Sequence, residues 1–226
     1  MRTVGIIGGM GPEATILLMQ KLLRAVPARD DADHIPLIVH QNPAVPSRIA
    51  RLIDGAGADP GPVLAQMARD LQAAGAQALA MPCNTAHAYA PQIIAATPLP
   101  FLDMRRATVA ALPRGRIGML ASPAVRLTGA FDAAFAAAGL TMVWPSDESA
   151  TLALIRRVKA GDSGPQALAG MAHLADAIAA RCDHLLVACT ELSLLTGAIE
   201  PPLTDSLDCL VSAVVGFAQG ALLPSP

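Results

Sequence analysis

The sequence is poor in aromatic residues and in charge of either sign. It has one Trp, one Tyr and four Phe among 226 residues, and 16 Lys and Arg against 18 Asp and Glu leave a net charge of −2. Binding of nucleic acids generally requires a basic surface for the phosphates, and binding of single strands also uses aromatic side chains on which bases stack. We therefore expect no nucleic-acid partner.

The sequence also lacks a hydrophobic run that would span a membrane. Its most apolar late stretch, residues 209–223, is interrupted by Ser212 and Gln219 and falls short of the roughly 18 residues that a span requires. The apolar run near the N-terminus is short and is followed by Glu13, which does not fit a secretory signal. We expect a cytoplasmic protein without a membrane partner, in which the cysteine thiols are reduced.

Apolar residues are abundant: the chain is 53% hydrophobic and 15% charged, which is ample for a packed core. Short β-branched or aliphatic runs alternate with longer Ala/Leu-rich runs along the whole chain, a pattern that predicts βαβ units and an α/β fold with parallel sheets. Pro12 and Glu13 predict the start of the first helix. Strands are expected at residues 3–8, 36–41, 76–81, 99–102, 116–120, 140–143, 183–188 and 202–204.

The two halves of the chain resemble each other. Residues 4–12 and residues 117–123 each join a strand to a helix through a turn of small residues. A second match further along aligns Cys83 with Cys189, and each of these follows a short apolar run. Because the order of elements is the same in both halves, we expect two similar half-size domains, related by a pseudo-twofold axis, with a cleft between them.

Cys83 and Cys189 are the strongest candidates for chemistry. Each is predicted to lie at the carboxyl end of a parallel strand and at a helix N-terminus, where α/β proteins bind ligands and where the helix dipole lowers the pKa of a thiol. Two thiols on opposite walls of one cleft suit a reaction that needs a base on one face of a carbon and an acid on the other, such as stereochemical inversion. Cys182 and Cys209 lack this context and are expected to be small apolar residues.

The glycine-rich turn at residues 8–11 resembles a dinucleotide-binding loop only in part. It does not match G-x-G-x-x-G, and the strand at residues 36–41 does not end in the acidic residue that such a site uses. Nicotinamide binding is therefore not expected. The turn is still suited to presenting the backbone amides of Met10 and Gly11 to a substrate carboxylate, because a helix N-terminus attracts anions.

Other cofactors have little support in the sequence. His87 stands four residues after Cys83, and His184 two residues after Cys182, but neither pair completes a usual zinc-ligand set. There is no Cys-x-x-Cys motif for thiol redox chemistry and no lysine in a recognisable Schiff-base setting for pyridoxal phosphate (PLP). We expect no metal and no cofactor, and two roles stay open for His87: assisting Cys83 or supporting the fold.

Three segments in this order resemble the cofactor-independent aspartate/glutamate racemase family, and within it the aspartate racemase branch. They are Gly-Gly-Met-Gly-Pro-Glu-Ala-Thr at residues 8–15, Met-Pro-Cys-Asn-Thr-Ala-His at residues 81–87 and Ala-Cys-Thr-Glu-Leu at residues 188–192. The resemblance runs nearly end to end and also includes residues 42–43, 46–48, 158–161 and 204–206.

This resemblance implies a domain organisation. The C-terminal helix would return to the first domain, so that the first domain comprises residues 1–98 plus 207–226 and the second comprises residues 99–206. It also implies a proton-transfer pair, Cys83 and Cys189, that works without PLP.

The same resemblance implies a set of substrate contacts. Arg48 and Lys159 would hold the substrate carboxylates. Hydrogen bonds to the α-amino acid head would come from Asn84, Thr85, Ser122 and Thr190. Members of the family commonly carry a hydroxyl residue where this chain has Val125 and a tyrosine where it has Phe131, so some substrate contacts are expected to differ.

We therefore expect a PLP-independent amino-acid racemase, an isomerase, that acts on aspartate by two-thiol proton transfer. Several alternatives stay open: a broad-specificity racemase, a related isomerase or decarboxylase of the same fold, and a non-catalytic amino-acid-binding protein. The last is disfavoured because binding alone requires no matched pair of thiols. A homodimer also stays open.

Overall fold

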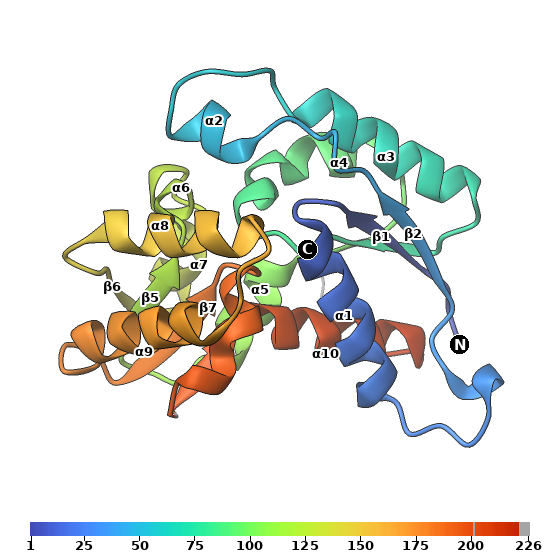
Figure 1. The fold of residues 1–226 in the computed structure, drawn as a ribbon. Helices are drawn as coiled ribbons and strands as arrows, with labels where there is room; N and C mark the ends of the chain where they lie inside the picture. Colours follow the sequence, from blue (N-terminus) through green and yellow to red (C-terminus); the bar gives the residue numbers. More distant parts are fainter. Residues whose placement is uncertain (201, 222–226) are drawn as a thin grey trace.

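The computed structural model describes residues 1–200 and 202–221. It contains two four-stranded parallel sheets, each flanked by helices on both faces (Figure 1). The strand order is β2-β1-β3-β4 in the first sheet and β6-β5-β7-β8 in the second, so the two sheets have the same topology. The expected α/β fold with two similar halves is confirmed, and all eight predicted strands are present with their ends shifted by at most two residues.

The elements of the first half run in the order β1 (Val4–Gly8), α1 (Pro12–Ala25), η1 (Asp31–Asp33), β2 (Leu37–Gln41), α2 (Arg48–Leu52), α3 (Gly61–Ala73), β3 (Ala78–Ala80), η2 (Thr85–Tyr89), α4 (Ala90–Ala96) and β4 (Phe101–Leu102). Those that follow are α5 (Met104–Ala111), β5 (Arg116–Ala121), α6 (Pro123–Leu127), α7 (Asp132–Ala138), β6 (Thr141–Val143), α8 (Glu148–Lys159), α9 (Pro165–Ala179), β7 (His184–Ala188), η3 (Leu192–Ala198), β8 (Leu203–Asp205) and α10 (Ser206–Ala218).

Strand β4 lies in a different half from the one expected. The sequence placed the domain boundary after residue 98, but Phe101 and Leu102 pair with β3 and complete the first sheet. The reason is topological: α4 forms the crossover from β3 to the next parallel strand, and such a crossover normally returns the chain to the same sheet. The rest of the proposed division remains a prediction, and its residues 222–226 lie outside the described part of the chain.

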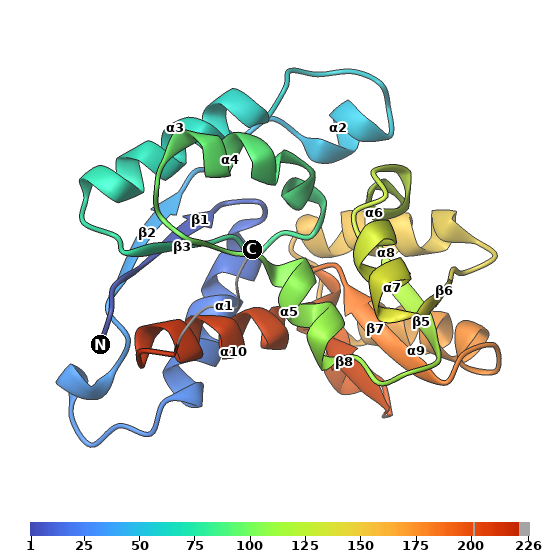
Figure 2. The ribbon, with the colours of Figure 1, turned by 180° about the vertical axis from the view of Figure 1, so that it is seen from behind.

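Helix α10 packs on the first half of the molecule. Figure 2 shows it beside α1, on the side of the first sheet opposite to α3 and α4. Its apolar side chains, among them Leu210, Val214 and Phe217, share a core with Val4 of β1 and Leu18 of α1. Burial of this apolar face supplies the free energy that holds the C-terminal helix there.

The turn between β1 and α1 depends on its glycines. Gly9 has a φ of +96°, and a Cβ atom there would lie 2.5 Å from the backbone of Asn42. The side-chain hydroxyl of Thr15 accepts a hydrogen bond from the Gly9 N–H at 3.0 Å. Helix α1 begins at Pro12, as the sequence predicts. The turn thereby places Met10 and Gly11 at the carboxyl edge of the first sheet, facing the second half.

Candidate active site

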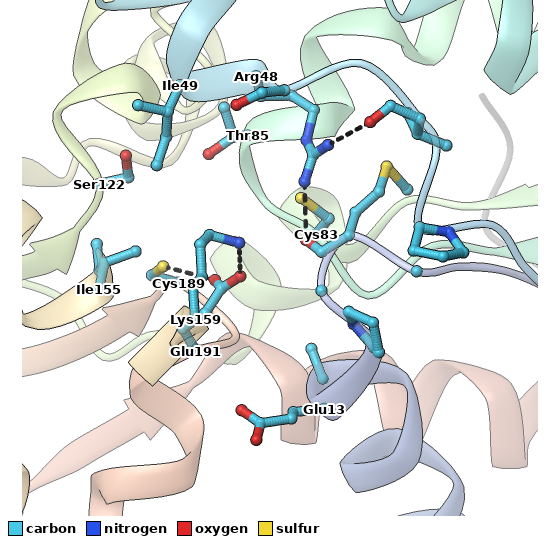
Figure 3. Close-up of a pocket in the computed structure, with 18 of the residues that line it drawn as sticks. Glu13, Arg48, Ile49, Cys83, Thr85, Ser122, Ile155, Lys159, Cys189 and Glu191 are labelled. Carbon is cyan, nitrogen blue, oxygen red and sulfur yellow. Dashed lines mark hydrogen bonds and ion pairs between the residues drawn. The ribbon is translucent and has the colours of Figure 1, made fainter. Parts of the chain in front are cut away.

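A cavity of about 580 Å³ lies between the two halves. Cys83, which follows β3, and Cys189, which follows β7, both line it (Figure 3). Strands β3 and β7 hold the same place in their sheets, so the internal repeat has brought two equivalent cysteines to one cavity. Both side chains are buried, with 6% and 5% of their surface exposed.

A charged pair stands next to Cys189. The Cys189 thiol donates a hydrogen bond to Oε2 of Glu191 at 3.1 Å, and Oε1 of the same carboxylate forms an ion pair with the ammonium group of Lys159. Glu191 is 7% exposed. The cavity wall therefore contains a continuous chain of interactions from a thiol through a carboxylate to an ammonium group (Figure 3).

These interactions raise the pKa of both the Cys189 thiol and the Lys159 ammonium group. Burial, the charge of Glu191 and the hydrogen bond to Glu191 raise the pKa of the Cys189 thiol well above its ordinary value, and the ammonium group of Lys159 only partly offsets them. Burial alone lowers the pKa of Lys159, but Glu191 and the two cysteines raise it more, so the pKa of Lys159 lies above its ordinary value. Cys189 is consequently held as a thiol beside a charged lysine.

Arg48 lines the opposite side of the cavity. Its guanidinium group donates hydrogen bonds to the backbone carbonyls of Val45, Pro46 and Met10, at 3.3, 3.0 and 3.2 Å. Its Nε atom is buried and has no partner in the described structure. These backbone contacts fix the orientation of the guanidinium group at the edge of the cavity.

The expected substrate-binding residues divide into two groups. Met10, Gly11, Arg48, Thr85, Ser122 and Lys159 line the cavity. Asn84 and Thr190 are buried beside it but are not among its lining residues. The amide of Asn84 donates to Ser206 at 2.9 Å, and the hydroxyl of Thr190 donates to the carbonyl of Pro82 at 3.1 Å. Asn84 and Thr190 thus connect parts of the protein, although Oδ1 of Asn84 has no partner among residues 1–200 and 202–221.

Both ring nitrogens of His87 lie within hydrogen-bonding distance of backbone groups. Its Nδ1 lies 2.8 Å from the carbonyl oxygen of Cys83, and its Nε2 accepts a hydrogen bond from the N–H of Met104 at 3.2 Å. These contacts require the proton on Nδ1. Burial lowers the pKa of His87 to about 4, although nearby Asp103 opposes the shift. Of the two roles considered for His87, this geometry favours support of the fold.

The remaining candidates lie away from the cavity. Burial raises the pKa of Cys209 to about 11, and burial also raises that of Cys182. Val125 and Phe131 belong to the apolar core beside β5, so neither departure from the family pattern alters the cavity wall. Within residues 1–200 and 202–221, no group of three side chains is arranged to hold a metal ion, and no helix has the length and apolar character to cross a membrane.

Glu191 is the residue of the site that the sequence analysis did not single out. It was noted only as part of the segment at residues 188–192. A signal was nevertheless present, because an acidic residue two positions after a strand-end cysteine will lie in the same turn as the thiol. Lys159 comes from 32 residues away, and their pairing could not be deduced from spacing.

Comparison with known proteins gives matches over most of the chain. The model of the Asp/Glu/hydantoin racemase family matches residues 7–214. The broad-specificity amino-acid racemase of Bacillus subtilis (strain 168) is 25% identical over 222 residues, which cover 94% of this chain and 96% of that protein.

Solved structures give the same picture. Aspartate racemase of Picrophilus torridus has a TM-score of 0.88 and 26% identity, covering 97% of this chain and 95% of that one. Glutamate racemase of Thermus thermophilus has a TM-score of 0.61 and 19% identity, covering 99% and 83%, and this likeness concerns the fold alone. The protein is thus an isomerase of the amino-acid racemase class. More narrowly, the match over most of its length shows that the chain belongs to the Asp/Glu/hydantoin racemase family.

Proposed function

We propose that the protein racemises aspartate without PLP, by transferring protons between the substrate α-carbon and the thiols of Cys83 and Cys189. One observation carries this proposal: two buried cysteines at equivalent strand ends of a duplicated fold line the same cavity. A binding protein has no need of such a pair, whereas inversion at carbon needs a base on one face and an acid on the other.

The reaction balances in protons. The thiolate of one cysteine removes the α-proton from one face of the substrate, and the thiol of the other cysteine delivers its proton to the opposite face. After one turnover the thiol and the thiolate have exchanged places, so this form of the enzyme converts the opposite enantiomer, and proton exchange with solvent restores the starting form. The hydrogen bond from Cys189 to Glu191 supports a state in which Cys189 is the acid and Cys83 the base.

Lys159 supports the reverse direction. Cys189 becomes the base once it has delivered its proton to a substrate molecule. The ammonium group of Lys159, already paired with Glu191, compensates the negative charge that then resides on the thiolate. The same positive charge, together with the backbone amides at the start of α1, favours the enolate-like charge that develops on the substrate carboxylate.

The substrate assignment rests on the cations of the cavity and on one relative. Arg48 and Lys159 line a cavity that both thiols also line. The structural relative from Picrophilus torridus is named an aspartate racemase. An amino acid with a second carboxylate uses two cationic anchors better than an apolar one.

A broad-specificity racemase is the second candidate, and a specific observation favours it. Lys159 is already paired with Glu191, and Glu13 also lines the cavity, so the acidic and basic side chains facing it balance. A balanced cavity attracts a second substrate carboxylate less strongly. The relative from Bacillus subtilis carries this broader name.

The test uses both enantiomers of aspartate, glutamate and alanine in D₂O, with optical inversion and α-deuterium incorporation measured together. Cys83→Ser and Cys189→Ser should each abolish inversion, because a serine hydroxyl is a far weaker acid than a thiol. Cys209→Ser, a substitution outside the cavity, is the control and should keep the activity. Full activity of either cavity variant would refute the two-thiol mechanism. A wild type that converts alanine as efficiently as aspartate would replace the aspartate assignment by the broad one.

A further inference from the structure

The junction of β8 and α10, at Asp205 and Ser206, is hydrogen-bonded to both cysteine-bearing loops. Ser206, the first residue of α10, is fully buried, and its hydroxyl accepts a hydrogen bond from the side-chain amide of Asn84 at 2.9 Å. Asn84 is the residue after Cys83. The start of α10 therefore holds the loop that carries the first thiol.

The neighbouring residue holds the other loop. Asp205 is 3% exposed and accepts a hydrogen bond from the hydroxyl of Ser193 at 2.7 Å. The N–H of Ser193 donates in turn to the carbonyl oxygen of Cys189 at 3.2 Å. Asp205 also caps α10 through the N–H of Leu207 at 2.9 Å. One carboxylate thus joins the helix start to the turn that carries the second thiol.

The two loops also touch directly. The hydroxyl of Thr190, next to Cys189, donates to the carbonyl oxygen of Pro82, next to Cys83, at 3.1 Å. With this bond the contacts form a closed circuit, which we call the linking ring. Its members are Pro82, Asn84, Ser206, Asp205, Ser193 and Thr190.

We propose that Asp205 and Ser206 are positioning residues, which set the separation of the two thiols by closing the linking ring. The inference rests on the proposed two-thiol function. A two-base inversion requires both sulfur atoms at the same α-carbon, on opposite faces, and a displacement of about 1 Å can reduce such a rate by as much as 100-fold. The cysteines lie in loops of different halves, so a link between the halves is needed to hold this distance.

Buried hydrogen bonds suit this task. The ring side chains of Asn84, Thr190, Ser193, Asp205 and Ser206 are all at most 4% exposed. A buried hydrogen bond cannot exchange with water without leaving a polar group unpaired, so its partners stay in one arrangement. Lys21 of α1 adds a further tie from the first half, because its ammonium group lies 3.5 Å from Asp205.

The decisive measurement is where solvent deuterium enters during turnover in D₂O. With both thiols in place, the opposite thiol supplies deuterium to the product while the starting enantiomer keeps its protium. With the opposite thiol displaced, the thiol that removed the proton has time to exchange with solvent and return deuterium to the same face. The ratio of deuterium in the recovered starting enantiomer to deuterium in the product therefore reports the separation of the thiols.

Ser206→Ala and Ser193→Ala each open the ring, whereas Asp205→Asn keeps an acceptor oxygen for it. We expect both alanine variants to lower kcat about tenfold or more, with little change in KM, and to raise the deuterium ratio about threefold or more. Asp205→Asn should keep a ratio near that of the wild type. Ser212→Ala, on the exposed face of α10, is the matched control. Circular dichroism at the assay temperature establishes that each variant is folded.

The outcomes separate the two proposals. Alanine variants that are folded and keep the wild-type deuterium ratio would overturn the positioning role, whatever their rate, because a loss of folded molecules lowers both deuterium pools equally. The proposed function, and the positioning role with it, would be overturned if the wild type inverts no amino acid. The same holds if the Cys83→Ser and Cys189→Ser variants still invert the substrate.

Discussion

Replacement of Glu191 by Gln should make Cys189 more reactive. The substitution keeps the size of the side chain and an acceptor oxygen but removes the negative charge 3.1 Å from the thiol. Burial and Glu191 together raise the pKa of Cys189, and Lys159 lowers it. In Glu191→Gln the lysine acts without its carboxylate partner, so the pKa of Cys189 must fall.

The size of the effect follows from the geometry. Two unit charges about 4 Å apart repel by about 4 kcal/mol at an effective dielectric constant of 20, and a hydrogen bond to a charged group contributes about 1.5–3 kcal/mol. At 1.36 kcal/mol per pKa unit, either contribution alone corresponds to about 1–3 units, and because Gln keeps an acceptor oxygen for the thiol we expect a fall within this range. Each unit raises the thiolate fraction tenfold at neutral pH, but nucleophilicity falls by about threefold. Alkylation should therefore accelerate about 3- to 30-fold.

The assay is the rate of alkylation of Cys189 by iodoacetamide at pH 7, followed by peptide mass spectrometry in a Cys83→Ser background. Glu13→Gln serves as the matched control, since Glu13 lines the same cavity and forms no hydrogen bond with the thiol in the described structure. An unchanged or slower rate in Glu191→Gln, or an equal acceleration in Glu13→Gln, would refute the reasoning.

Two further predictions concern stability. Gly9→Ala should lower the free energy of unfolding by about 2 kcal/mol or more, because a positive φ is costly for alanine and its Cβ would lie 2.5 Å from the Asn42 backbone. Urea denaturation measures this, with Gly197→Ala as the control because a Cβ there meets nothing within 4 Å. Burial lowers the pKa of His87 from 6.5 to about 4, so between these values the unfolded chain binds more protons, and His87 should contribute about 3 kcal/mol to a rise of unfolding free energy with pH. In urea denaturation from pH 4 to 7, the unfolding free energy of His87→Gln should rise less steeply with pH than that of the wild type. An unchanged pH dependence would exclude His87 as the group responsible.

Much of the fold could be predicted because its causes are local. The alternation of apolar runs located all eight strands, since the spacing of apolar residues reflects which faces of each element are buried. Pro12 marked the start of α1 for an equally local reason. Gly139, whose φ is +66°, ends α7 because glycine adopts this left-handed conformation readily. The prediction that β4 belongs to the second half was wrong, because the sheet that a strand joins depends on which strand lies beside it in the folded protein.

The two cysteines could also be located from the sequence. Cys83 and Cys189 end equivalent strands of a repeat, and in parallel sheets the carboxyl ends of strands meet at the ligand-binding edge. Their presence on one cavity follows from topology. The sequence by itself therefore determined the architecture and the location of the two cysteine thiols.

Only the tertiary structure decided what surrounds them. The partners of Glu191, Asn84 and Thr190 lie 32, 122 and 108 residues away, and no local pattern specifies contacts at such distances. Asn84 and Thr190 were expected to bind substrate, yet their side chains bind other parts of the protein because the packing of the halves brings acceptors within reach. The direction of a side chain depends on its neighbours in space, and these are set only when both sheets and α10 have packed together.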